Sequence, residues 1–95
     1  MHEEILNESI DVIVRYRSIP SKNDKLFLRQ RCYPVRFRRQ NGQEISVSEL
    51  GLSYPVREGR SLKYIFDVTD GHDDYRLEFN TDSLAWLLTR RADND

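Results

Sequence analysis

The chain has 95 residues, of which 38% are hydrophobic and 33% are charged, and its fifteen basic and sixteen acidic residues leave a net charge of −1. This length allows one hydrophobic core, and the balanced charge excludes bulk attraction to nucleic acid through net charge alone. The apolar runs are too short to cross a bilayer and no signal pattern opens the chain, so we expect a cytoplasmic protein without a membrane partner.

The N-terminal third predicts a tail, a strand and a loop. Residues 1–9 are polar and acidic, and we expect a flexible tail. Residues 10–17 alternate between apolar and polar side chains, which predicts the first strand of a single β domain over residues 10–91. Pro20 and the Asn23-Asp24 pair mark a loop over residues 18–25.

A second β region follows, and Pro34 interrupts it. Proline has no amide donor and belongs at an edge, a bulge or the start of a strand. We therefore predict two strands, over residues 26–32 and 35–39, with a bend between them. Asn41-Gly42 then predicts a tight hairpin turn of type I′, which leads into a strand over residues 44–47.

The next segment predicts little regular structure. Ser48-Glu49-Leu50-Gly51 resembles one helical turn, capped by serine and closed by glycine. Residues 53–61 contain Pro55 and Gly59 and predict a connecting loop.

The clearest pattern in the chain is a hairpin. Residues 62–69 and 74–80 each alternate with period two, and Asp70-Gly71-His72-Asp73 supplies the turn between them. One face of this hairpin is aromatic, with Tyr64, Phe66, Tyr75 and Phe79 on it. We expect this face to form the core.

The C-terminal segment over residues 83–91 allows two interpretations. Leu84, Leu87 and Leu88 have helical spacing, whereas Leu84, Trp86 and Leu88 share one face of a strand. A strand is favoured because an aromatic antiparallel sheet needs closing. Residues 92–95 are expected to form a flexible tail.

Together these elements predict a mainly β fold, a small antiparallel β-barrel or a strongly bent sheet of five to six strands. Closing the sheet would remove exposed edges that a small domain must otherwise protect. The side chains expected to fill the interior are Val12, Val14, Phe37, Ile45, Tyr64, Phe66, Val68, Tyr75, Phe79 and Trp86.

The alternation of residues 64–79, followed by Trp86-x-Leu88 and preceded by the hairpin from Val35 to Gly42, resembles the small stand-alone β-barrel proteins of bacteria. Some of these proteins are encoded near genes for error-prone DNA polymerases. The resemblance covers about residues 33–90 and implies a barrel fold, but no activity. The chain differs from that pattern in having its own N-terminal strand and a long segment from Leu50 to Ser61.

Basic residues are concentrated between residues 25 and 39, where no acidic residue occurs. Arginines on one face of a strand, with aromatic neighbours, can bind phosphates and single-stranded nucleic acid. They can equally form a solvated face or pair with the acidic hairpin. The candidate residues for binding nucleic acid or a partner are Arg29, Arg31, Tyr33, Arg36, Arg38 and Arg39.

The outer face of the hairpin is acidic in turn, and Arg76 is the only basic residue between positions 67 and 82. The acidic residues are Asp67, Asp70, Asp73, Asp74, Glu78 and Asp82. The hairpin turn lacks the acidic spacing of a calcium loop, and neither histidine stands beside a nucleophile. Cys32 is the only cysteine and excludes an internal disulfide. We therefore expect no catalytic residues, no metal and no cofactor. The pattern favours a non-enzymatic interaction module that binds a protein partner or its own copy through oppositely charged faces, with nucleic-acid binding as the alternative.

Overall fold

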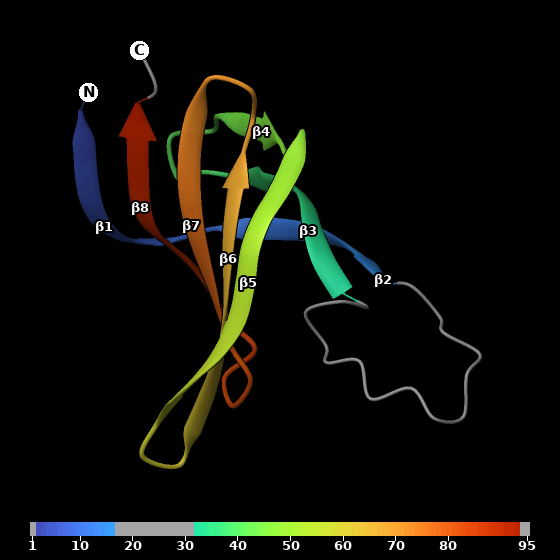
Figure 1. Cartoon of the computed structure of the whole chain (residues 1–95), viewed down its shortest axis with the longest axis vertical. Helices are drawn as coiled ribbons and strands as arrows, with labels where there is room; N and C mark the ends of the chain where they lie inside the picture. Colours follow the sequence, from blue (N-terminus) through green and yellow to red (C-terminus); the bar gives the residue numbers. More distant parts are fainter. Residues whose placement is uncertain (1, 17–31, 94–95) are drawn as a thin grey trace.

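A computed structural model describes residues 2–16 and 32–93, which form eight β-strands and no helix (Figure 1). The strands are β1 (Glu3–Ser9), β2 (Asp11–Tyr16), β3 (Cys32–Arg38), β4 (Glu44–Ser46), β5 (Glu49–Glu58), β6 (Ser61–Thr69), β7 (Asp73–Asn80) and β8 (Trp86–Asp93). All the pairings between them are antiparallel. The predicted β class is therefore confirmed.

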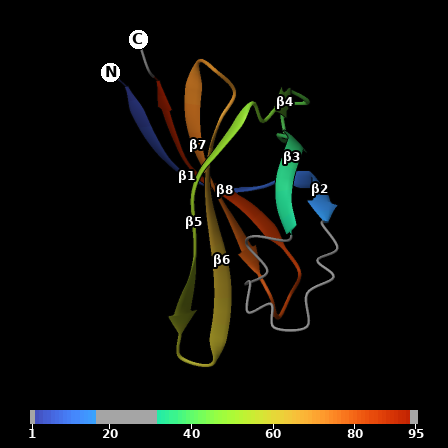
Figure 2. The same ribbon diagram turned by 45° about the vertical axis from the view of Figure 1, so that its right-hand side comes forward.

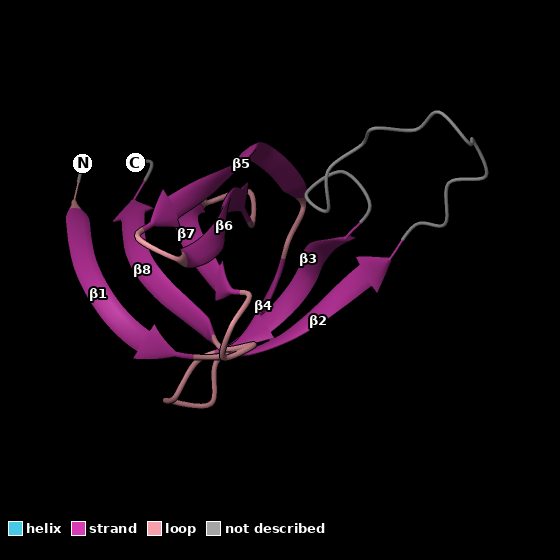
Figure 3. Cartoon of the chain, turned by 90° about the horizontal axis from the view of Figure 1, so that it is seen from below, coloured by secondary structure: helices cyan, strands magenta, loops and turns pink. Residues whose placement is uncertain are grey.

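The strands make two sheets. One has five strands in the order β1-β8-β7-β6-β5, and the other has three in the order β2-β3-β4. The larger sheet curves from β1 to β5, and β2 and β3 lie to one side of it (Figure 3).

The chain passes directly between the sheets at two corners. Only Ile10 separates β1 from β2, and its N–H donates to the carbonyl of Trp86. Two residues separate β4 from β5: the N–H of Val47 donates to Val35, and that of Ser48 donates to Thr69. The corner residues thus remain hydrogen-bonded to one sheet or the other.

The core lies between the sheets, and the hairpin of β6 and β7 supplies half of its buried side chains. The Phe37 and Tyr75 rings meet edge to face, with their centroids 5.2 Å apart. Each large apolar side chain buried here stabilises the fold by roughly 1.5–3 kcal/mol. The buried core side chains are Ile10, Phe37, Ile45, Phe66, Val68, Tyr75, Leu77 and Leu88.

Most of the predicted interior is confirmed. Val12, Tyr64, Phe79 and Trp86 pack against the core while remaining partly exposed. Val14 is the exception, because it is 39% exposed on the edge strand β2.

Two segments predicted to be irregular are strands. Residues 1–9 contain β1, which pairs with β8, so the predicted tail is wrong. Residues 49–58 form β5, so the predicted helical turn at 48–51 and the loop at 53–61 are also wrong. Pro55 is tolerated because β5 is an edge strand.

The C-terminal segment forms a strand from Trp86, as favoured, and the helix over residues 83–91 is excluded. The strand extends to Asp93, and Ala92 is buried, so the tail predicted from residue 92 begins too early. The 74–80 hairpin strand is confirmed as β7, and residues 10–17 contain β2.

Around Pro34 and Gly42 the details differ from the prediction. Pro34 lies inside β3, next to a register shift against β2, instead of between two strands. Apart from Cys32, the predicted strand over residues 26–32 lies outside the described residues. At the turn only Gly42 has positive φ, whereas a type I′ turn needs two such residues. The N–H of Gly42 donates to Arg39 and that of Arg39 donates to Gln43, which closes a three-residue loop.

Candidate functional site

The predicted arginine stripe does not form one surface. Arg29 and Arg31 lie outside the described residues. Arg36 and Arg38 point away from the core on β3, because they alternate with the buried Phe37. Tyr33 packs against the core, so it is not a free stacking platform.

Arg39 is held between the sheets. Its guanidinium donates to both carboxylate oxygens of Glu8, at 3.1 and 2.8 Å, and both side chains are only 15% exposed. The Arg39 hydrogen bonds hold the pKa of the Glu8 carboxyl below its usual value, although burial opposes this shift. Arg39 therefore joins the two sheets and is not available to a ligand.

The two exposed arginines share one carboxylate. Arg36 and Arg38 each lie 3.9 Å from Glu44, and all three side chains are more than half exposed. Asp11 lies opposite Arg38 across the β2–β3 ladder. All four charged side chains line one shallow pocket of about 130 Å³. Because these charges largely cancel, the surface is a weak candidate for binding phosphates, and nucleic-acid binding stays a prediction.

Acidic side chains of the hairpin form ion pairs with arginines that do not belong to β3. Asp67 accepts two hydrogen bonds from Arg76, at 2.8 and 3.2 Å, and Asp73 accepts one from Arg91 at 2.7 Å. Asp70 instead accepts backbone N–H groups within its own turn. Among the described residues no ion pair joins this hairpin to the arginines of β3.

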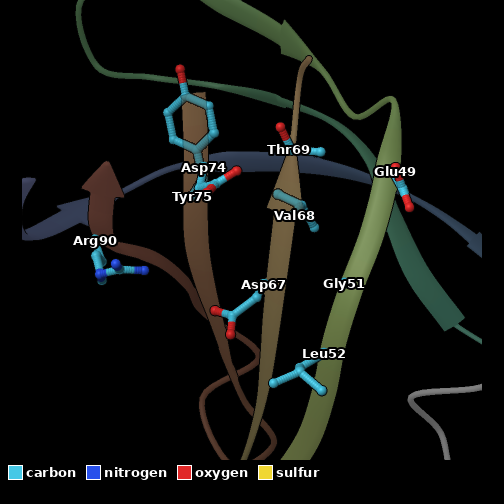
Figure 4. A pocket seen from close by; sticks show the side chains of 9 residues that line it. All are labelled: Glu49, Gly51, Leu52, Asp67, Val68, Thr69, Asp74, Tyr75 and Arg90. Carbon is cyan, nitrogen blue, oxygen red and sulfur yellow. The ribbon is translucent and has the colours of Figure 1, made fainter. Parts of the chain in front are cut away.

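A pocket lies along the outer side of this hairpin. We call it the outer groove, and its volume is about 390 Å³. Asp67 stands near its middle, with Arg90 of β8 on one side and Leu52 of β5 on the other (Figure 4). Its lining residues are Glu49, Gly51, Leu52, Asp67, Val68, Thr69, Asp74, Tyr75 and Arg90.

A β-bulge shapes one wall of the outer groove. The register between β5 and β6 shifts between Leu50 and Ser53, which places Gly51 against β6. A Cβ atom at Gly51 would stand 3.1 Å from the carbonyl oxygen of Asp67, so the close approach favours glycine. Bulges of this kind often redirect side chains next to binding sites. Here Leu52 is left 69% exposed.

The outer groove carries an excess of negative charge. Asp67 is paired with Arg76, and Arg90 is paired with Glu3. Glu49 and Asp74, by contrast, have no ion-pair partner within the parts of the chain that the structure describes. Two carboxylates are therefore free to meet an incoming cation.

Metal binding and thiol chemistry find little support. In the described ranges no group of three or more histidine, cysteine or acidic side chains is placed to hold a metal ion. Burial raises the pKa of the Cys32 thiol, which lowers its reactivity at neutral pH. No helix long and apolar enough to cross a membrane occurs in the described residues.

The sequence analysis did not predict the outer groove, although it placed part of its lining on one face of the hairpin. Asp67 and Asp74 were assigned to the outer, acidic face of the hairpin, and they line the groove. Glu49 and Leu52 were missed because their segment was predicted to be a helical turn and a loop. The alternation of Ser53, Tyr54, Pro55 and Val56 was too weak a signal to reveal β5.

The chain was compared with known proteins in three ways. No protein-family model, no curated protein sequence and no solved structure matches it. The resemblance to small bacterial β-barrel proteins therefore stays a prediction.

Proposed function

We propose that the protein is a non-enzymatic interaction module whose outer groove binds a basic, extended segment of a partner protein. The observation that carries this proposal is the pair of carboxylates, Glu49 and Asp74, that line the groove and form no ion pair with any residue that the structure describes. A partner that supplies lysine or arginine would complete the charge balance. Such complementarity contributes mainly to specificity and to the rate of association.

The shape of the outer groove supports an extended ligand. The groove crosses strands β5 to β8 and combines charged side chains with the exposed apolar side chain of Leu52. An extended segment that carries cations and an apolar side chain on one face could meet both the carboxylates and Leu52. Exposed charge pairs contribute only about 0.2–1 kcal/mol each, so the expected affinity is modest.

We further propose that the fold behaves as a small six-stranded barrel. If β1 and β2 count as one bent strand, and β4 and β5 as another, each of the six strands has a neighbour on both sides, although β1, β2, β4 and β5 themselves each pair on one side only. The hydrogen bonds of Ile10, Val47 and Ser48 at the corners support this view. Strands that switch between sheets through bends are a known way to make such corners.

Peptide binding tests the proposed function. A labelled peptide of alternating lysine and threonine should bind the protein at low salt, as measured by fluorescence anisotropy, and an alternating glutamate-threonine peptide should not. The Glu49→Gln/Asp74→Asn double variant should bind the basic peptide roughly three- to tenfold more weakly. High salt should also weaken binding, because it screens exposed charges.

The matched control changes net charge by the same amount outside the groove. Glu44→Gln/Asp82→Asn removes two carboxylates that do not line it. This control should bind the basic peptide nearly as well as the wild type. Equal losses in both double variants, or no binding at low salt, would reject the outer groove as the site.

A further inference from the structure

β2 lies at an open edge of the three-stranded sheet, on the side of β3 opposite β4 (Figure 2, Figure 3). Within the described residues it pairs only with β3. The register shift in this ladder comes from an extra residue in β3, so β2 itself is regular over Asp11–Tyr16. Its outward backbone N–H and C=O groups can accept another strand.

The other edge strands carry features that discourage such pairing. β5 contains Pro55 and a bulge, β4 has three residues, and β1 is acidic and irregular against β8. Proline, bulges, short strands and charges are the usual means by which proteins protect their sheet edges. β2 lacks proline and a bulge of its own.

β2 also exposes apolar side chains. Ile13 is 58% and Tyr16 62% exposed, and Val14 is exposed beside them. A regular edge strand with exposed apolar residues is a surface on which a further strand can add. The charged residues near the two ends of β2 determine which strand can pair with it.

The sequence of β2 complements itself. In an antiparallel ladder alternate residues direct their backbone groups to opposite sides. In two copies that pair through the same edge, facing residues therefore direct their backbone groups the same way and are both odd-numbered or both even-numbered. The numbers of two facing residues then add to an even sum. The sum 26 places Ile13 opposite Ile13, Val12 opposite Val14, and Asp11 opposite Arg15.

We propose that two copies of the chain associate through β2, antiparallel and about a twofold axis at Ile13, with Asp11 of each copy facing Arg15 of the other. Among the registers with an even sum, this is the one in which oppositely charged residues of β2 face each other. Neither Asp11 nor Arg15 forms an ion pair inside the described part of the chain, although Asp11 lies opposite Arg38 across the β2–β3 ladder. Both side chains can therefore turn toward a second copy. Isologous contacts of this kind close after two copies.

The dimer is expected to be weak. Stable interfaces bury roughly 1,200–2,000 Å², more than one short strand pair can supply. Sedimentation velocity from micromolar to millimolar concentration should show a monomer–dimer equilibrium. A wild-type protein that stays monomeric over this range would overturn the proposal.

A charge exchange tests the register. Arg15→Asp places like charges opposite each other at both ends of the ladder and should weaken the dimer by about tenfold or more. Asp11→Arg should do the same, and the Asp11→Arg/Arg15→Asp double variant should restore association. An unchanged dimer in both single variants, or no recovery in the double variant, would overturn this pairing.

Cross-linking gives a second measurement that does not depend on the charge variants. In a Cys32→Ser background, Ile13→Cys should form a disulfide-linked dimer on mild oxidation, because the two Ile13 positions face each other. Val14→Cys should cross-link much less, and the reverse order would overturn the register. Because the outer groove lies on the other sheet, Arg15→Asp should leave peptide binding unchanged, and either proposal can fail without the other.

Discussion

Two neighbouring arginines at the end of β3 have opposite roles. Arg38 points outward, is 58% exposed and lies 3.9 Å from Glu44. Arg39, the next residue, lies between the sheets, is 15% exposed and binds Glu8 at 2.8 Å. The difference teaches that the direction of a side chain, more than its chemical type, decides whether an arginine holds the fold together or meets solvent.

The largest expected effect comes from the core-facing side of β3. Phe37→Ala removes a buried ring that contacts Tyr75 and should lower the free energy of unfolding by about 3–5 kcal/mol. Arg36→Ala, on the outer face, should lower it by less than about 1 kcal/mol. Urea unfolding followed by circular dichroism measures both values, and similar losses would contradict the division of β3 into two faces.

Arg38 and Arg39 can be compared through the same substitution, arginine to methionine. Arg39→Met leaves the mostly buried Glu8 carboxylate without its cation and should cost roughly 2–3 kcal/mol, below the range for fully buried pairs. Arg38→Met removes an exposed charge and should change stability by less than about 0.5 kcal/mol. The same urea titrations apply, and an Arg39 effect as small as that of Arg38 would show that the inter-sheet pair contributes nothing.

The smallest effect is a pH dependence. Because Arg39 lowers the pKa of Glu8 in the folded state, this carboxylate adds stability above the pKa of an unfolded glutamate, about 4.3. That stability is lost as the pH falls through the lower, folded pKa. The wild type should thus exceed Glu8→Gln in stability at neutral pH, and their difference should shrink from about pH 5 downward. A difference that is constant with pH would contradict this assignment.

The outer groove shows where prediction from the sequence stops. Asp67 and Asp74 were placed on one outer face because period two continues through both hairpin strands. Glu49 and Leu52 join them only because β5 pairs with β6, and Gly51 and Pro55 hide that strand in the sequence. β1 was hidden for another reason, since its inward positions include the charged Glu8 instead of an apolar residue.

The sequence by itself determined the β class, the central hairpin and the alternation of β3, because these patterns depend on neighbours a few residues apart. Only the tertiary structure decided that residues 3–9 and 49–58 are strands and that the C-terminal segment pairs with both β1 and β7. It also decided that Arg39 is structural, since its partner Glu8 lies 31 positions away. Contacts between distant segments provide the partners of these charges and backbone groups, and the local sequence pattern does not reveal such contacts.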